Sequence, residues 1–161
     1  MEPQPIPQVS QYGSVDPAPP EPLGNVDAWR TTLLDETIPL FHRMRAVFSL
    51  RNHRSDEACL ALCDGFDAKS ALLRHEIAYV LGQMQNNVAL PTLTERLEDN
   101  DEHVMVRHEA AEAMGAIGDV SVVPTLRKHA LDPQPEVSES CEVALDLLKW
   151  VASAEFENAD W

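Results

Sequence analysis

The sequence predicts an all-α protein, an α-solenoid of four helical hairpins that follows an extended, Pro-rich N-terminal arm. Apolar residues recur at spacings of three and four, as at Leu73, Ile77 and Val80, which is the pattern of an amphipathic helix. No segment alternates apolar and polar residues with a period of two, so we expect almost no β-strand. The third and strongest observation is an internal repeat of about 33 residues.

Two stretches of the chain carry this repeat most clearly. RHEIAYVLGQMQNNVALPTL begins at Arg74, RHEAAEAMGAIGDVSVVPTL begins at Arg107, and the two agree at eight positions. A further step of 33 residues reaches SCEVALDLL at Ser140, and a step of 31 residues back from Arg74 reaches RMRAVFSLR at Arg43. Four copies of a two-helix unit of this length are typical of an α-solenoid, in which the stacked units share one continuous core.

The repeat divides the chain into an N-terminal arm, a repeat domain and a C-terminal tail, which we place at residues 1–26, 27–154 and 155–161. The four hairpins of the repeat domain are expected near residues 27–52, 55–85, 87–118 and 119–154. Three prolines fall where a helix would begin, at Pro39, Pro91 and Pro124. Proline is tolerated there because the N–H that it lacks has no partner in the first helical turn.

The arm holds seven of the 12 prolines, all within residues 1–22. This stretch is polar and has no periodicity, which favours an extended arm or linker, with an unstructured tail as the alternative.

The charge balance limits the classes of partner. The chain has 12 Lys and Arg against 27 Asp and Glu, a formal net charge of −15. This excess argues against nucleic acid and anionic membrane surfaces, since both are bound by patches of Lys and Arg. No stretch approaches 18 apolar residues, so no membrane span is expected. Three cysteines, two of them at Cys59 and Cys63 in an expected helix, indicate the reduced thiols of an intracellular, cytoplasmic protein rather than a disulfide framework.

Only the two central repeats carry a His-Glu pair at the same place, His75-Glu76 and His108-Glu109. Equivalent positions of stacked repeats lie on neighbouring helices, whose axes are roughly 8–10 Å apart. A histidine from each helix can therefore reach one metal ion between them. Neighbours along a helix point about 100° apart, so Glu76 need not share the ion that His75 binds.

The same pairs have a second interpretation, as a ladder of polar residues hydrogen-bonded between repeats without a metal. Burying four titratable groups without a metal would be costly, but the spacing leaves both interpretations open. A zinc protease motif is absent, because the residues four after His75 and His108 are Tyr79 and Glu112 rather than histidine. Two carboxylates with two histidines suit iron, or manganese.

The repeat register also predicts positions and roles for other residues of the hairpins. Tyr79 and Glu112 lie one turn after the histidines on the same face, and they are candidate contacts to the metal ligands or to a substrate. The alternatives are a half-buried aromatic residue of the hairpin core for Tyr79 and an ordinary exposed charge for Glu112. Cys141 takes the histidine position of the last repeat but has no Cys or His close by, so we expect it in the core. The histidines without a partner in the repeat register are expected at the surface: His42, His53, His103 and His129.

The motifs RHEIAYVLGQMQ and VRHEAAEAMGAIGD resemble the metal motifs of the deoxyhypusine hydroxylase family, and SVDPAPP, LFHRMRAVFSLRN and PEVSESCEVALDLL resemble its flanking segments. The resemblance covers roughly residues 12–150. It implies HEAT-like hairpins in a protein of two similar halves, each with four repeats, and a non-haem di-iron centre between the halves. It also implies a monooxygenase of hypusine biosynthesis that uses O₂ to hydroxylate the deoxyhypusine side chain of a translation factor.

This chain resembles the C-terminal half of that family, and its Pro-rich start resembles the connector between the halves. Residue by residue, the resemblance implies that His75, His108 and Glu109 bind one Fe²⁺, while Glu76 reaches the other. Two of four motifs supply half of the ligands, so an N-terminal half or a second copy of the chain would complete the site. A cationic deoxyhypusine side chain would be drawn to the acidic surface. The alternative function is a HEAT-like scaffold for protein interactions that binds no metal.

Overall fold

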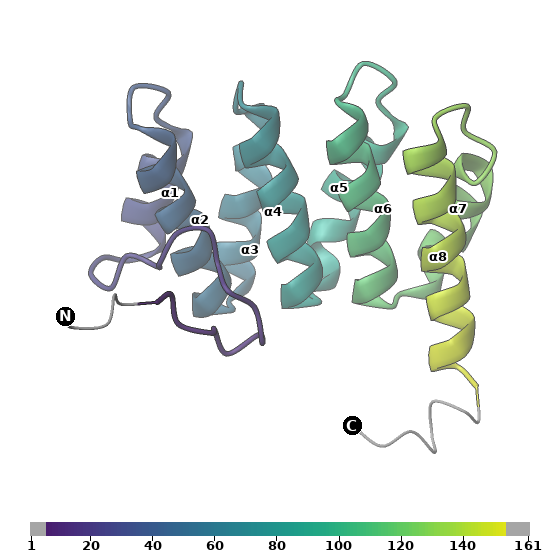
Figure 1. The fold of residues 1–161 in the computed structure, drawn as a ribbon, viewed down its shortest axis with the longest axis horizontal. Coiled ribbons are helices and arrows are strands. Elements are labelled where there is room, and N and C mark those ends of the chain that lie inside the picture. Colours follow the sequence, from purple (N-terminus) through teal and green to yellow (C-terminus); the bar gives the residue numbers. More distant parts are fainter. Residues whose placement is uncertain (1–5, 154–161) are drawn as a thin grey trace.

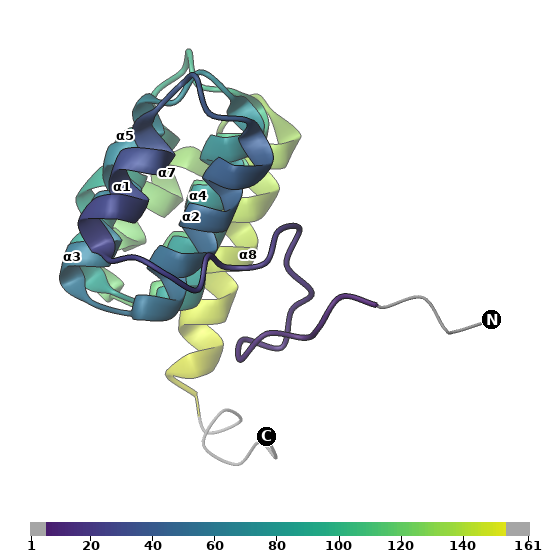
Figure 2. The ribbon, with the colours of Figure 1, turned by 90° about the vertical axis from the view of Figure 1, so that its left-hand side faces the viewer.

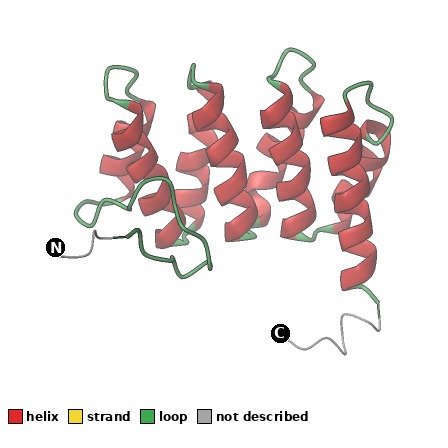
Figure 3. Ribbon diagram, in the orientation of Figure 1, coloured by secondary structure: helices red, strands yellow, loops and turns green. Residues whose placement is uncertain are grey.

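The computed structural model describes residues 6–153 of the chain. Within this range eight α-helices stand side by side as four hairpins, and the only β-type pairing is an isolated bridge between Val9 and Val15 (Figures 1 and 3). The helices are α1 (Val26–Leu34), α2 (Leu40–His53), α3 (Asp56–Asp64), α4 (Ala71–Met84), α5 (Leu90–Glu98), α6 (Val104–Ile117), α7 (Val123–His129) and α8 (Pro135–Val151). The predicted fold class, an α-solenoid of four hairpins with an extended arm, is confirmed. None of the helices in the described range is long and apolar enough to cross a membrane.

The hairpins form two layers. The end-on view separates α1, α3, α5 and α7 from the layer that contains α2, α4 and α8 (Figure 2). In this second layer α4 packs against both α2 and α6, and α6 packs against both α4 and α8. Leucine, valine and alanine side chains fill the space between the layers, and buried Cys59, Cys63 and Cys141 are free thiols. The predicted core position of Cys141 is therefore confirmed.

Short polar side chains begin three of the helices. Asn25, Ser55 and Ser70 each accept a hydrogen bond from a backbone N–H in the first turn of α1, α3 and α4, at 2.9–3.1 Å. Prolines mark three further helices as predicted, because Pro39 immediately precedes α2, Pro91 is the second residue of α5 and Pro124 is the second residue of α7. The fourth hairpin reaches Val151, and the tail placed at residues 155–161 lies outside the described residues.

The arginine that opens each of the first three repeated motifs has a structural role. Arg43 and Arg107 are buried, and each donates from Nε to the carbonyl at the end of the preceding helix, Leu33 at 2.9 Å and Leu97 at 3.0 Å. Arg74 donates from Nη1 to the Ala68 carbonyl, in the segment between α3 and α4, at 2.8 Å. Each guanidinium thereby satisfies a carbonyl that lacks a helical partner and ties the two helices of a hairpin together.

Two glycines at equivalent positions of the repeat set the spacing within the second layer. A Cβ on Gly82 of α4 would lie 3.0 Å from the Ala113 Cα of α6, and a Cβ on Gly115 of α6 would lie 2.8 Å from the Ala144 Cβ of α8. Neighbouring helices therefore approach more closely than any other residue would allow. This close approach brings the outer faces of α4, α6 and α8 within reach of one another.

The arm is held against α2 by its residues from Tyr12 to Glu21. In Figures 1 and 2 it crosses the outer side of α2, on the face that points away from the first layer. Ala18 is buried there, and the Ser49 hydroxyl both accepts from the Glu21 N–H at 2.7 Å and donates to the Glu21 carbonyl at 2.9 Å. The alternative of an unstructured tail therefore does not describe these residues.

Candidate metal centre

The two predicted histidines meet one carboxylate on the outer face of the second layer. His75 Nε2 of α4 lies 3.2 Å from Glu109 Oε1, and His108 Nε2 of α6 lies 3.3 Å from the same oxygen. The helices bring these atoms together because a step of 33 residues places His75 and His108 at equivalent positions of adjacent repeats. All three side chains are partly buried.

A hydrogen bond from α8 fixes the tautomer of His108. The Ser140 hydroxyl donates its only proton to the Glu136 carbonyl at 2.6 Å, so it accepts from His108 Nδ1, which lies 2.6 Å away. A neutral His108 then carries its lone pair on Nε2, which faces the negative Glu109 oxygen. Two acceptors at this distance need a cation between them, either a proton or a metal ion, and the residues present therefore fit a divalent metal.

Glu112 belongs to the same cluster. Its carboxylate lies 3.7 Å from His108 Nδ1, and one donor atom each from His108, Glu109 and Glu112 fall within 4.8 Å of one another, close enough to bind a single ion. The side chain is nearly half exposed, as expected for a residue at the edge of a site. This group of three does not include His75, whose Nε2 contacts Glu109.

Glu76 stands apart from the His75–Glu109–His108 contact. Its half-buried carboxylate forms no hydrogen bond or ion pair with any residue in the described range. Burial is the main cause that raises the pKa of Glu76 above its ordinary value, with His75 opposing this effect and Glu109 adding to it. Burial likewise raises the pKa of Glu109, while the two histidines oppose it. A bound cation would relieve both carboxylates of their mutual repulsion.

Tyr79 lines a groove beside these residues. It is 39% exposed, and its hydroxyl accepts a hydrogen bond from Gln83 Nε2 at 3.3 Å. The groove has a volume of about 380 Å³, and Glu109 and Glu112 stand on its wall. The rest of its lining is mostly small or apolar: Gly82, Ala113, Ala116, Val143, Ala144 and Leu147. Tyr79 therefore faces the groove at the surface, and the alternative of a half-buried core residue fits it less well.

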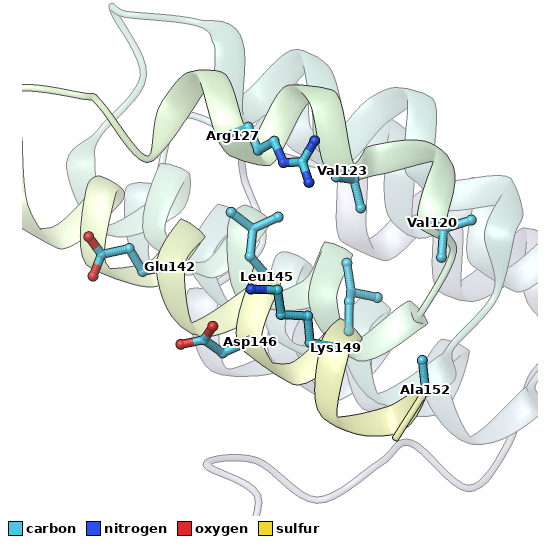
Figure 4. A pocket seen from close by; sticks show the side chains of 9 residues that line it. Val120, Val123, Arg127, Glu142, Leu145, Asp146, Lys149 and Ala152 are labelled. Atoms are coloured by element: carbon cyan, nitrogen blue, oxygen red, sulfur yellow. The ribbon is translucent and has the colours of Figure 1, made fainter. Parts of the chain in front are cut away.

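Another groove lies at the C-terminal edge of the solenoid, between α7 and α8 (Figure 4). Val123 and Arg127 of α7 face Leu145 and Lys149 of α8 across it, and its volume is about 550 Å³. It contains none of the predicted site residues. Its wall carries both signs of charge and no histidine, so it does not resemble a metal site.

The structure corrects one histidine and adds one serine. His42, His53 and His103 are exposed as predicted, but His129 is buried, so its predicted surface position is wrong. His129 follows buried Leu126 by three residues and therefore shares its inward face of α7. The role of Ser140 was missed, although the repeat places it one residue before Cys141, on the helix next to His108.

Comparison with known proteins places this geometry in a family. A family model of HEAT repeats matches residues 39–105 and 62–146, which together cover more than half of the chain. The chain belongs to the HEAT-repeat family. The solenoid of HEAT hairpins predicted from the 33-residue repeat is thus supported by sequence as well as by structure.

Relatives about 50% identical to this chain are deoxyhypusine hydroxylases, which confirms the resemblance drawn from the two motifs. The protein of Danio rerio is 54% identical over 149 residues, which cover 92% of this chain and 49% of the relative. That of Arabidopsis thaliana is 56% identical over 151 residues, 93% of this chain and 46% of the relative. The structure of human deoxyhypusine hydroxylase in complex with glycerol matches with a TM-score of 0.86 and 51% identity, covering 89% of this chain and 50% of the human one. The chain spans about half the length of the relatives it matches.

Proposed function

We propose that this chain is the metal-binding, C-terminal half of a deoxyhypusine hydroxylase, a cytoplasmic non-haem di-iron monooxygenase of hypusine biosynthesis. The observation that carries the proposal is the convergence of His75 Nε2 and His108 Nε2 on one Glu109 oxygen, at 3.2 and 3.3 Å. The names of relatives about 50% identical to this chain support the same reaction class. The match covers about half of each relative's length, which supports the proposal that this chain corresponds to one half of such a molecule.

In this proposal His75, His108 and Glu109 hold one Fe²⁺, and Glu76 contributes to a second. Bound ferrous iron would supply the redox chemistry with O₂ that protein side chains lack. The chain itself holds the His108 ring in one tautomer through Ser140 and excludes water from one side of the ligands by packing α4 against α6. Tyr79 and Glu112 border the ligands on the groove side and are positioned to contact a substrate.

The proposed substrate is a deoxyhypusine side chain on a translation factor. Such a side chain is long, partly aliphatic and cationic. The groove beside the ligands offers small apolar residues along its floor and the Glu109 and Glu112 carboxylates on its wall, and the whole chain carries a net charge of −15. Acidic residues of this kind steer a cationic substrate toward the site and repel anionic polymers.

Anaerobic titration with ferrous iron tests metal binding by this chain. The wild-type chain is expected to bind iron, and His75→Ala should weaken binding by more than the roughly 10–100-fold effect of losing a supporting residue. His42→Ala removes an exposed histidine of α2 and is the matched control, with unchanged affinity. If the wild-type chain binds no iron and His75→Ala alters only stability, the metal proposal fails and the HEAT-like interaction scaffold replaces it.

A mixing experiment tests completion of the site. The chain is combined with an N-terminal half that carries two further His-Glu motifs, and hydroxylation of a deoxyhypusine-bearing protein is measured. We expect activity only in the mixture, because this chain supplies four of the expected ligands. Glu76→Ala should reduce the iron content of the mixture from two ions toward one, whereas His108→Ala should remove the ion held by the two histidines. Equal loss of both ions in the two variants would contradict the assignment of Glu76 to the second iron.

A further inference from the structure

Gln83 of α4 connects the N-terminal arm to the groove beside the candidate ligands. It lines the groove together with Tyr79, and its amide Nε2 donates to the Tyr79 hydroxyl at 3.3 Å. Its Oε1 accepts from Arg51 Nη1 of α2 at 3.0 Å, and its Nε2 also donates to Ser14 Oγ of the arm at 3.5 Å. The amide is therefore bound on the arm side and on the groove side at once.

The arm holds Arg51 in place through Asp16. The guanidinium donates to Asp16 Oδ1 at 2.9 Å and to Oδ2 at 2.7 Å. The Arg51 side chain is completely buried, and that of Asp16 is 8% exposed. The Tyr12 ring covers the guanidinium at 4.5 Å. A two-pronged, buried pair fixes the cation far more firmly than a surface pair would, so the donor that Gln83 meets is held in one place.

These partners leave the Gln83 amide one orientation. A guanidinium donates hydrogen bonds and cannot accept them, so the amide oxygen must face Arg51. The Ser14 hydroxyl donates its own proton to Asp16 at 2.9 Å, and its oxygen therefore accepts from Gln83. The opposite orientation would bring amide N–H groups against the guanidinium. The amide nitrogen is consequently the group that faces Tyr79.

The fixed amide decides how Tyr79 acts in the groove. A phenol has one proton, and the Tyr79 oxygen already accepts from Gln83. No acceptor for the Tyr79 proton lies among residues 6–153, so this proton is available to a ligand in the groove. Hydrogen bonds in a chain polarise one another, and the guanidinium at its start strengthens the phenol as a donor. The groove thus offers a donor from α4 and the acceptors Glu109 and Glu112 from α6.

We propose that Gln83 is a positioning residue which, oriented by Arg51 and Asp16, holds the Tyr79 hydroxyl as a hydrogen-bond donor for a peptide carbonyl of the substrate. The inference rests on the proposed function and names the part of the substrate that the α4 side of the groove binds. The carboxylates of α6 attract the ammonium groups, and Tyr79 binds the chain that carries them. A fully protonated polyamine has only donors, so the groove favours an amine that is attached to a peptide.

Binding of two probes to the iron-free chain, measured by calorimetry, tests this role. One probe is a short peptide with a deoxyhypusine residue, and the other is N-butylputrescine, the same diamine without a peptide. Tyr79→Phe should weaken binding of the peptide about fivefold, the loss of one hydrogen bond, and leave binding of N-butylputrescine unchanged. Equal changes for the two probes would show that Tyr79 does not bind the peptide part and would refute the proposal.

Gln83→Glu separates the polarity of this residue from its packing. The new carboxylate keeps the size of the side chain and still accepts from Arg51, but it cannot donate, so it takes the proton of Tyr79 for itself. The ratio of peptide affinity to N-butylputrescine affinity should fall about fivefold, although the added charge attracts both probes. Gln11→Glu adds the same charge at an exposed residue of the arm and should leave the ratio unchanged. A purely structural role of Gln83 predicts an unchanged ratio in both variants, and that result would overturn the proposal.

The double variant Asp16→Asn/Arg51→Met tests the contribution of the arm. It removes the cation that orients the amide without leaving a buried charge unpaired, so the chain should still fold. The amide is then free to turn over, and the affinity ratio should fall about twofold. A wild-type ratio in the folded double variant would show that the arm does not orient Gln83.

NMR of the ligand-free chain separates failure of this inference from failure of the proposed function. The Tyr79 Cζ resonance should move downfield in Gln83→Glu, because the phenol now donates to a carboxylate, and should stay in place in Gln11→Glu. An unmoved resonance in Gln83→Glu would refute the orientation of Tyr79 by Gln83. A downfield shift in a chain whose wild type binds neither probe would support that orientation and refute the substrate assignment of the proposed function.

Discussion

The inner and outer repeats use the same position of the unit in different ways. On α4 and α6 this position holds His75-Glu76 and His108-Glu109, and both histidines are partly exposed. On α2 and α8 it holds Met44-Arg45 and Cys141-Glu142, and both Met44 and Cys141 are buried. All four hairpins share the same helix–turn–helix arrangement, so the comparison isolates what the residues at this position contact.

The arm covers the outer face of α2. Arg45 occupies the position that Glu76 has on α4, and it donates to the Pro19 and Pro20 carbonyls of the arm at 3.0 and 3.3 Å and pairs with Glu21. At the other end Glu142 is exposed at the edge of the groove between α7 and α8 (Figure 4). The two histidines and Glu109 come together only on α4 and α6, the two neighbouring helices that both carry a His-Glu pair.

The largest expected effect separates the two kinds of repeat directly. His108→Ala should lower the ferrous-iron affinity of the chain by on the order of 100-fold or more, because it removes a ligand that faces Glu109 at 3.3 Å. Cys141→Ala changes the equivalent residue of α8 and should lower stability, since its side chain is completely buried, without changing iron affinity. Iron titration and denaturant unfolding of both variants measure this contrast. A weaker iron affinity in Cys141→Ala would mean that the outer repeat also contributes to the site.

The repeat was predictable from sequence because a two-helix unit must present the same residue types at each turn of the solenoid. The 33-residue step locates the helices, and it also predicts that His75 and His108 lie side by side. Contacts between segments that do not repeat could not be predicted in this way. The arm has no periodicity that would announce the Asp16–Arg51 pair, and its attachment depends on hydrogen bonds to single residues such as Ser49.

The candidate site, too, was predictable from the sequence only in part. The register predicted which side chains share a face, but not which atom of a histidine points at which carboxylate oxygen. The tautomer of His108 depends on Ser140, which the repeat aligns with an arginine of the inner units rather than with a polar partner. The predicted surface position of His129 was wrong for a related reason. A single histidine near a helix end does not indicate which side of the helix is buried.

An intermediate effect is expected at the two glycines that set the helix spacing. The added methyl groups in Gly82→Ala and Gly115→Ala should each destabilise the chain by about 1–3 kcal/mol through overpacking. The higher helix propensity of alanine offsets part of this loss. Gly115→Ala should be the more costly in stability, because its Cβ would lie 2.8 Å from Ala144. Gly82→Ala should weaken iron binding more than Gly115→Ala does. It pushes α4 away from α6 and so separates His75 from His108, whereas Gly115→Ala moves α6 away from α8 and disturbs the Ser140–His108 hydrogen bond. Calorimetry with parallel iron titration measures both quantities, and equal iron affinities for the two variants would show that helix spacing does not limit the site.

The smallest effect tests how far the outer repeat supports the inner one. Ser140 lies on α8, yet its hydroxyl is the acceptor that places the proton of His108 on Nδ1. Ser140→Ala should therefore lower iron affinity by about tenfold, the loss typical of a residue that orients a metal-bound histidine, while leaving the fold intact. Ser138→Ala is the matched control, because Ser138 also donates to a carbonyl of the first turn of α8 but contacts no histidine. NMR of the His108 ring nitrogens would show directly whether the Nδ1–H form is lost in Ser140→Ala. If that form persists at unchanged population, then the carboxylates around His108 set its tautomer, and the inner repeats orient their ligands without help from α8.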